Sequence, residues 1–250
     1  MAKASAPGRA KTRLVPPLSF DEAAALNTAF LRDVADNVLL AARQSAAHAG
    51  IAAYAAYGPT GSEAFFRDIL PAAVGLIEAW LPNFGDCLFH TIEQVFARGH
   101  ASAVVLNSDS PTLPTAILIE TAEALARPGD RAVLGPSNDG GYYLLGLKSA
   151  RRRLFDDIAW STERVAEQTL ERAREIDLDV HRLPVWYDVD DIEGLGRLYA
   201  ELCEPHRERR FGAYNPHYAR QTAKLMDRLG RQHDFARRGD GIVQVEQMRA

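Results

Sequence analysis

The sequence predicts an α/β protein in which strands lie between helices. Strand-like and helix-like segments alternate over about the first two hundred residues, and this alternation is typical of a sheet covered by helices. Apolar residues make up 47% of the 250-residue chain, and charged residues make up 25%. A chain of this length and composition can bury one good core and carry an appendage.

Several segments have helix signals. Ser19 and Glu22 have the spacing of a capping box, and the Ala- and Leu-rich stretch after them predicts a long helix to about His48, ended by Gly50. Further helices are expected at 62–70, 84–98, 115–126, 150–155, 163–175 and 192–202.

Short apolar runs predict the strands. They are expected at 51–57, 74–80, 103–107, 131–135, 142–147 and 180–183, with a turn at 138–141. The run 103–107 has the composition of a strand buried on both faces of a parallel sheet, and the polar residues 108–110 and Pro111 interrupt it abruptly. Asp109 is therefore expected at the carboxyl end of a strand.

The composition changes after residue 203. The segment 204–250 is rich in Arg and His and poor in strand-forming residues, so we expect a domain of residues 1–203 followed by a helical extension with a loose tail. A solvated packing or oligomerisation extension and an acceptor or partner site are both open for this segment. Homo-oligomerisation would use it.

Charge and targeting signals limit the function classes. The formal net charge of −4 gives no general reason to expect a nucleic acid as partner. The first residues lack the apolar core of a signal peptide, and no apolar run of about 18 residues predicts a membrane span, so a cytoplasmic protein is expected. Cys87 and Cys203 are too few for a disulfide framework and are expected to be reduced thiols.

Three common signatures are absent from the sequence. The chain has no Gly-x-x-x-x-Gly-Lys-Ser/Thr, no Gly-x-Gly-x-x-Gly after a strand and no Gly-x-Ser-x-Gly. These absences argue against a P-loop NTPase, a dinucleotide-dependent dehydrogenase and an α/β-hydrolase elbow.

A basic motif occupies residues 7–14. Gly8 permits close approach of the backbone, and Lys11 and Arg13 can neutralise phosphate oxygens, which predicts a clamp for a di- or triphosphate. A basic loop that is merely solvated is the alternative for this motif taken alone.

Two further motifs supply carboxylates. In Ser108-Asp109-Ser110, Asp109 could hold a divalent cation that bridges phosphates, since Mg²⁺ usually takes one or two protein carboxylates. Alternation along an extended segment would put Asp188 and Asp190 on one side, which suits metal ligation. The alternative is capping of a helix or turn by Asp109, or of the following helix by Asp190 or Asp191, and capping and ligation can coexist.

A glycine-rich motif lies between them, at Asp139-Gly140-Gly141. Taken alone, this sequence is most often a hairpin turn. Two glycines beside a carboxylate could also let the backbone lie against a sugar or ribose.

Taken in order, the motifs resemble a known family. They read Pro-Gly-x-x-Lys-Thr-Arg-Leu, Ser-Asp-Ser-Pro-x-Leu-Pro, Gly-Pro-x-x-Asp-Gly-Gly-Tyr-Tyr-Leu, Trp-Ser-Thr and Asp-Val-Asp. Their combination looks like the bacterial glycosyltransferase-like family known as domain of unknown function 2064. That family belongs to the nucleotide-diphospho-sugar transferases with the GT-A fold, and it is similar to molybdenum-cofactor and phospholactate nucleotidyltransferases. The resemblance runs from Lys3 to about Leu202.

The resemblance implies a Rossmann-like GT-A fold, with a mainly parallel central sheet flanked by helices and the nucleotide over its carboxyl edge. It also implies a Mg²⁺- or Mn²⁺-dependent transferase that uses a nucleotide-activated donor and an unknown small-molecule acceptor. Glycosyl transfer from a nucleotide sugar and nucleotidyl transfer from a nucleoside triphosphate are both open, with a slight physical lean to the nucleotidyl type. The alternative is a nucleotide-binding or scaffold protein without turnover.

Residue roles follow from the matched positions. Gly8, Lys11 and Arg13 would bind phosphate, and Asp109 and Asp190 would bind metal or donor. The donor or acceptor pocket would be lined by Ser108, Asp139, Gly140, Gly141, Trp160 and Ser161. In this scheme Lys11 and Arg13 stabilise developing charge, and Asp139 accepts the acceptor's proton if the acceptor is not already ionised.

The sequence departs from the family pattern at two places. Members usually have a full apolar strand before the phosphate loop, whereas only Met1 to Lys3 stand in that place here, so a shortened first strand is expected. The segment around Asp109 supplies one carboxylate and not the Asp-x-Asp common in glycosyltransferases. This favours a divided site, with Asp109 and Asp190 on different loops.

Overall fold

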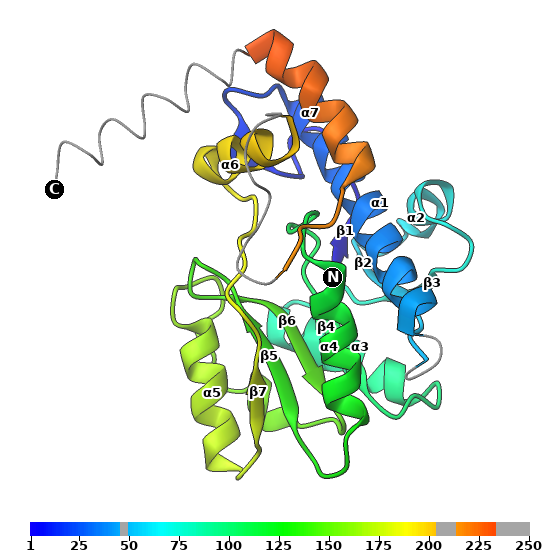
Figure 1. Cartoon of the computed structure of the whole chain (residues 1–250), viewed down its shortest axis with the longest axis vertical. Coiled ribbons are helices and arrows are strands. Elements are labelled where there is room, and N and C mark those ends of the chain that lie inside the picture. The colour runs from blue at the N-terminus through cyan, green and yellow to red at the C-terminus, as the bar shows by residue number, and fades with distance from the viewer. Residues whose placement is uncertain (46–49, 204–213, 234–250) are drawn as a thin grey trace, which may run out of the picture.

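Two sheets and the helices packed against them form the core of residues 1–45, 50–203 and 214–233, the part of the chain that the computed structural model describes (Figure 1). The first sheet has the order β1-β2-β3, with β1 at Ala2–Lys3, β2 at Tyr54–Gly58 and β3 at Gly75–Glu78. The second has the order β4-β6-β5-β7, with β4 at Ala103–Leu106, β5 at Ala132–Pro136, β6 at Tyr142–Leu147 and β7 at Val180–Arg182. The first sheet is parallel, β5 and β7 are parallel, and β6 runs antiparallel to both of its neighbours.

Helices connect most of the strands. The α-helices in the described residues are α1 (Phe20–Ser45), α2 (Glu63–Ile69), α3 (Phe84–Phe96), α4 (Thr115–Ala126), α5 (Val165–Glu175), α6 (Ile192–Cys203) and α7 (Arg220–His233). Two short 3-10 turns are η1 (Thr12–Leu14) and η2 (Arg152–Phe155). None of the described helices is long and apolar enough to cross a membrane.

The second sheet is buried on both of its faces along β5, whereas Val104 of β4 is 39% exposed. Neighbouring residues of a strand point to opposite faces, and Val133 of β5 packs with α1 and α4 while Ala132 and Leu134 pack with α3 and α5. The sheet is therefore the middle of three layers, as the resemblance implied.

The two sheets meet beside β1. The terminal amine of Met1 donates to the carbonyl oxygen of Leu106 at the end of β4 (2.6 Å), and the Ala4 N–H donates to the carbonyl oxygen of Gly58 at the end of β2 (2.8 Å). The loop that follows β1 therefore starts between the ends of β2 and β4, and it lies at the same edge as the loop that carries Asp109.

A cavity of about 400 Å³ lies next to this junction. Residues of β1, β2 and β4 line it together with apolar side chains of α1 and α4, among them Leu31, Val38 and Leu125. β2 pairs with β3 from Tyr54 to Tyr57, but it pairs with the two-residue β1 only at its last two positions. The cavity thus lies beside the part of β2 that is left unpaired because β1 is only two residues long.

Most of the expected elements are confirmed, several within one or two residues of the predicted bounds. The capping box forms as predicted, because the Ser19 N–H donates to Glu22 Oε2 (2.8 Å) and the Glu22 N–H donates to Ser19 Oγ (3.2 Å). The structure corrects the type and length of the helix expected at 150–155. It is the 3-10 turn η2, in which N–H groups bond to carbonyls three residues earlier, and Asp157 after it has a positive φ of 55° that an α-helix cannot continue through.

Some expectations lie outside the described residues. These are the end of the first helix at 46–48 and the parts of the carboxyl-terminal extension at 204–213 and 234–250. Within the extension, α7 lies beside α1 and α6 (Figure 1) and buries Thr222, Ala223, Met226, Leu229 and Gly230.

A carboxylate from α1 caps the start of α7. Asp33 is almost completely buried, and its two oxygens accept from the N–H groups of Gln221 (2.9 Å) and Thr222 (2.7 Å). The first N–H groups of a helix have no partner within the helix, so this distant side chain replaces a local N-cap.

We predict that Asp33→Ala lowers the free energy of unfolding by about 1–3 kcal/mol, because it leaves two N–H groups at the start of α7, one of them buried, without an acceptor. Urea denaturation of the full chain measures the change. Asp36→Ala, at an exposed position of the same helix, is the control and is expected to change stability by less than about 0.5 kcal/mol. Equal effects of the two substitutions would contradict the capping role.

Candidate functional site

Three oxygen atoms from two distant segments surround the ammonium group of Lys11. Its Nζ lies 2.7 Å from Asp109 Oδ1 and 2.8 Å from Asp190 Oδ1, and it donates to the carbonyl oxygen of Val189 at 2.7 Å. These contacts use the three N–H donors that an ammonium group has. The Lys11 side chain is 6% exposed, whereas those of Asp109 and Asp190 are 30% and 47% exposed. The site is therefore open on the side of the carboxylates.

The loop after β1 gives Lys11 its position. Lys11 has a left-handed backbone conformation with φ 50°, uncommon for a residue with a side chain, and precedes the turn η1. Its ammonium lies 5.3 Å from the ring centroid of Phe30, in α1. Burial by itself lowers the pKa of Lys11, but the charges of Asp109 and Asp190 and the hydrogen bonds to them together outweigh this effect. The pKa therefore lies above its ordinary value, and the group is charged at neutral pH.

Direct bonds join the two segments that carry the carboxylates. The Val189 N–H donates to the carbonyl oxygen of Asp109 (2.9 Å), and Ser110 Oγ donates to the carbonyl oxygen of Tyr187 (2.8 Å). The Tyr187 hydroxyl in turn donates to the buried Glu201 of α6 (2.9 Å). Asp109 and Asp190 are consequently held on one framework, independent of Lys11.

Asp188 is a partly buried carboxylate whose pKa is raised. Burial, which is the largest cause, and the charges of Asp139, Asp190 and Asp109 together raise its pKa from 3.8 to about 6. The other three carboxylates therefore lie close enough to Asp188 to act on it, although only Asp109 and Asp190 contact Lys11.

The glycine-rich motif forms a tight contact with a later loop. Gly140 has φ +86°, and a Cβ on it would lie 2.0 Å from the carbonyl oxygen of Glu163. The Ala166 N–H at the start of α5 donates to the Gly140 carbonyl oxygen (2.9 Å), and Asp139 Oδ1 accepts from the Gly141 N–H (2.9 Å). Only glycine fits at position 140, because both the backbone conformation and the close approach exclude a side chain.

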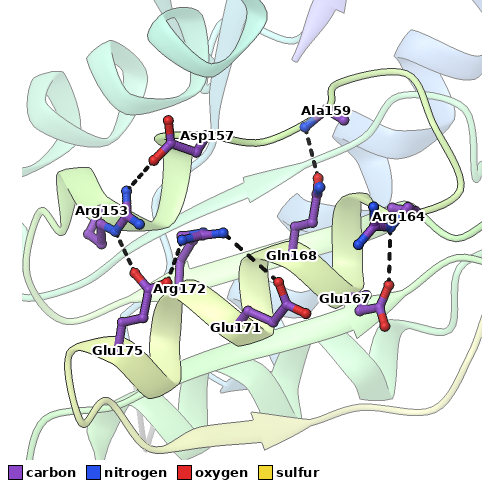
Figure 2. A network of polar contacts seen from close by, with 9 residues as sticks. All are labelled: Arg153, Asp157, Ala159, Arg164, Glu167, Gln168, Glu171, Arg172 and Glu175. Carbon is purple, nitrogen blue, oxygen red and sulfur yellow. Dashed lines mark hydrogen bonds and ion pairs between the residues drawn. The ribbon is translucent and has the colours of Figure 1, made fainter.

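Trp160 and Ser161 lie in the loop between η2 and α5. Figure 2 shows Gln168 of α5 directed at the main chain of this loop, where it accepts from the Ala159 N–H at 2.8 Å. Arg153 of η2 bonds to both Asp157 and Glu175, each at 2.6 Å, and so fixes the start of the loop to the end of α5 (Figure 2).

Within that loop the two predicted pocket residues differ. Trp160 packs edge to face against Phe84 at 5.4 Å and covers Gly85, where a Cβ would lie 2.7 Å from its indole nitrogen. Ser161 is exposed and has a positive φ of 64°. Trp160 is thus at least a packing residue, and its role toward a ligand stays a prediction.

The remaining predicted residues lie around the same edge. Ser108 Oγ is 3.4 Å from Asp109 Oδ1, and Gly8 is exposed with φ +70°. Arg13 is exposed on η1, and among the described residues it forms no ion pair with the carboxylates that contact Lys11. The structure therefore brings Lys11 and Asp109 together with Asp190, and it leaves Arg13 at the surface.

The chemistry of the donor set suits a hard divalent cation. Asp109, Asp139, Asp188 and Asp190 supply only oxygen donors and carry more negative charge than Lys11 balances, which fits Mg²⁺ or Mn²⁺. In the described part of the chain, no three His, Cys, Asp or Glu side chains already stand close enough together to hold a metal. Mg²⁺ takes most of its remaining ligands from water and substrate phosphates, so one or two carboxylates suffice.

Two contributors to the site were not predicted from the sequence. The Val189 carbonyl is a backbone group, and no residue type marks it. Ser110 was recognised only as part of the motif, whereas its hydroxyl joins the loop of Asp109 to the segment of Asp190. The signal available in the sequence was that Ser110 directly follows Asp109 after the end of a strand.

Comparisons with known proteins bear on the family and the fold. The family model described as "Uncharacterized protein conserved in bacteria (DUF2064)" matches residues 40–162. A crystal structure from Desulfovibrio desulfuricans G20, provisionally assigned as a nucleotide-diphospho-sugar transferase, is similar with a TM-score of 0.73 and 27% identity, covering 91% of this chain and 94% of that chain. No curated protein matched. The expected family resemblance and the GT-A-like fold are confirmed.

We predict that Gly140→Ala lowers the free energy of unfolding by about 2–4 kcal/mol, because the new Cβ meets the Glu163 carbonyl in a strained conformation. Gly61→Ala is the matched control, since Gly61 has φ +82° but nothing within 4 Å of an added Cβ. Gly61→Ala should lose only the free energy needed to hold a side chain at a positive φ, about 1–2 kcal/mol. Chemical denaturation compares the two, and equal losses would contradict the close approach.

We predict that Asp188→Asn stabilises the protein at pH 7.5 by about 1–2 kcal/mol, a value reduced by solvent screening. The folded state binds the Asp188 proton more tightly than the unfolded chain, so this group costs stability as the pH rises from about 4 to about 6. The gain should therefore disappear toward pH 4. Urea denaturation in metal-free buffer at both pH values measures it, and a pH-independent gain would refute the electrostatic cause.

Proposed function

We propose that this chain, whose residues 40–162 match the DUF2064 family model, is a metal-dependent transferase that binds the phosphates of a nucleotide-activated donor. The observation that carries the proposal is the convergence of Lys11, Asp109 and Asp190 at the carboxyl edge of the strands, where ligands of open α/β sheets bind. A buried cation beside partly exposed carboxylates suits a phosphate–metal complex better than a purely structural ion pair, which would not need the open side.

Each residue has a distinct part in this proposal. Asp109 and Asp190, with Asp188 beside them, would hold Mg²⁺ or Mn²⁺, and the metal when bound would neutralise charge on the donor phosphates. Lys11 would stabilise the negative charge that develops on the leaving group, as a cation held close to the phosphates. The backbone at Gly8 would lie against the phosphates, with Arg13 reaching them from η1.

The pocket residues would orient the rest of the donor and the acceptor. Gly140 and Gly141 leave room for a sugar or ribose, and the loop of Trp160 and Ser161 borders them. Asp139 is exposed and would accept the proton of an acceptor hydroxyl. Most of the rate enhancement would come from positioning and electrostatics, which is usual for transfer from activated phosphates.

Two donor classes have separate support. The similarity to the structure from Desulfovibrio desulfuricans G20 favours glycosyl transfer from a nucleotide sugar. The divided carboxylates, with Lys11 between Asp109 and Asp190, favour nucleotidyl transfer from a nucleoside triphosphate. A thermal-shift panel of both ligand classes, with and without Mg²⁺ or Mn²⁺, separates them, because selective binding to the folded state raises its apparent stability.

We predict that Asp109→Asn lowers turnover of the donor identified by that panel by about a hundredfold or more, with the fold intact by circular dichroism. Asp68→Asn, at an exposed position at the end of α2, is the control and should keep its turnover. Unchanged turnover of Asp109→Asn would end the metal role. Donor binding without any turnover in the wild-type chain would favour the nucleotide-binding or scaffold alternative.

A further inference from the structure

The oxygen atoms around Lys11 have the composition of a cation site. Two are carboxylate oxygens, of Asp109 and Asp190, and the third is the carbonyl oxygen of Val189. Carboxylate and carbonyl oxygens are the ligands that hard divalent cations take in proteins. The site therefore has a third oxygen beyond the two carboxylates that the proposed function assigns to the metal.

In this structure the ammonium group of Lys11 occupies that position. All three oxygens lie within 2.8 Å of Nζ. A divalent cation drawn to the same three oxygens would come within a few ångströms of the ammonium, and like charges at that separation repel strongly where little water screens them. The two cations therefore exclude each other.

The oxygens are the fixed part of the site and the lysine is the movable part. Hydrogen bonds of Val189 to Asp109 and of Ser110 to Tyr187 hold the oxygen framework without any contribution from Lys11. Lys11 is attached by a flexible four-carbon stem to a loop whose neighbours Gly8 and Arg9 are exposed.

We propose that Lys11 and a divalent cation bind alternately to the oxygen triad of Asp109, Val189 and Asp190, so that metal enters as Lys11 moves out to the phosphates. The inference rests on the metal dependence in the proposed function, and it adds the order in which Lys11 leaves and the metal binds. Lys11 is a resident cation that neutralises part of the charge of the triad until a phosphate-bearing ligand offers it another partner. Metal alone is consequently a poor ligand for the wild-type chain.

The test measures binding of Mn²⁺ alone by electron paramagnetic resonance, in the full chain and without any nucleotide. Lys11→Met removes the competing charge and is expected to bind Mn²⁺ at least tenfold more tightly than the wild type. Lys11→Arg keeps the charge and should bind as weakly as the wild type. Lys224→Met, at an exposed position on α7, is the control for loss of one positive charge elsewhere.

Two outcomes would overturn the proposal. One is Mn²⁺ affinity in Lys11→Met that is equal to or below the wild-type value. The other is a gain that persists in the double variant Lys11→Met with Asp109→Asn, since the new site would then lie elsewhere. If Lys11→Met does not fold, Lys11→Gln serves in its place, because its amide can still donate to the Val189 carbonyl.

The inference and the proposed function can fail separately. Dependence of wild-type turnover on Mg²⁺ or Mn²⁺ is measured with the donor present and does not require competition by Lys11. A metal-dependent wild-type enzyme whose Lys11→Met variant binds Mn²⁺ no more tightly would retain the proposed function and lose the exchange.

Discussion

The bonds between the Lys11 ammonium and the two carboxylates join parts of the chain that the backbone keeps far apart. Lys11 follows the first strand of one sheet, while Asp109 and Asp190 follow strands of the other. Removing a lysine from water is costly unless its charge is paired and its donors are satisfied, and here both conditions are met. The position of the loop that carries Lys11, relative to the segments of Asp109 and Asp190, depends on this single arrangement.

Neighbouring features make the arrangement possible. The loop of Asp109 is bonded to the segment of Asp190 along its backbone, and Tyr187 connects that segment to α6. The negative charge exceeds what one lysine neutralises, and burial together with this charge raises the pKa of Asp188. A site with this balance favours ligands that bring positive charge together with phosphate. The chemistry proposed for the molecule follows from that imbalance more than from any one catalytic group.

The sequence was most informative where a local rule determined the structure. Local backbone requirements apply in any fold. Three of them are visible in the sequence: the capping box at Ser19, the interrupted strand before Asp109 and the glycine at position 140. Tertiary contacts were harder to predict. Lys11 and Arg13 have equal charge and lie two residues apart, yet the turn η1 leaves only Lys11 against the carboxylates. The Val189 carbonyl belongs to the backbone, so no residue type indicates its contribution.

The two-residue strand β1 has a consequence for how the molecule opens. Strand pairing across the junction of the two sheets is short, and a cavity of about 400 Å³ replaces packing beside it. Regions with little buried apolar contact and few protected hydrogen bonds open locally before the whole protein unfolds. Amide hydrogen exchange around Ala2 and Ala4 should therefore be faster than in β5 and β6. Because the site draws its groups from both sheets, an occupied site would slow that exchange and make the sheets behave as one cooperative unit.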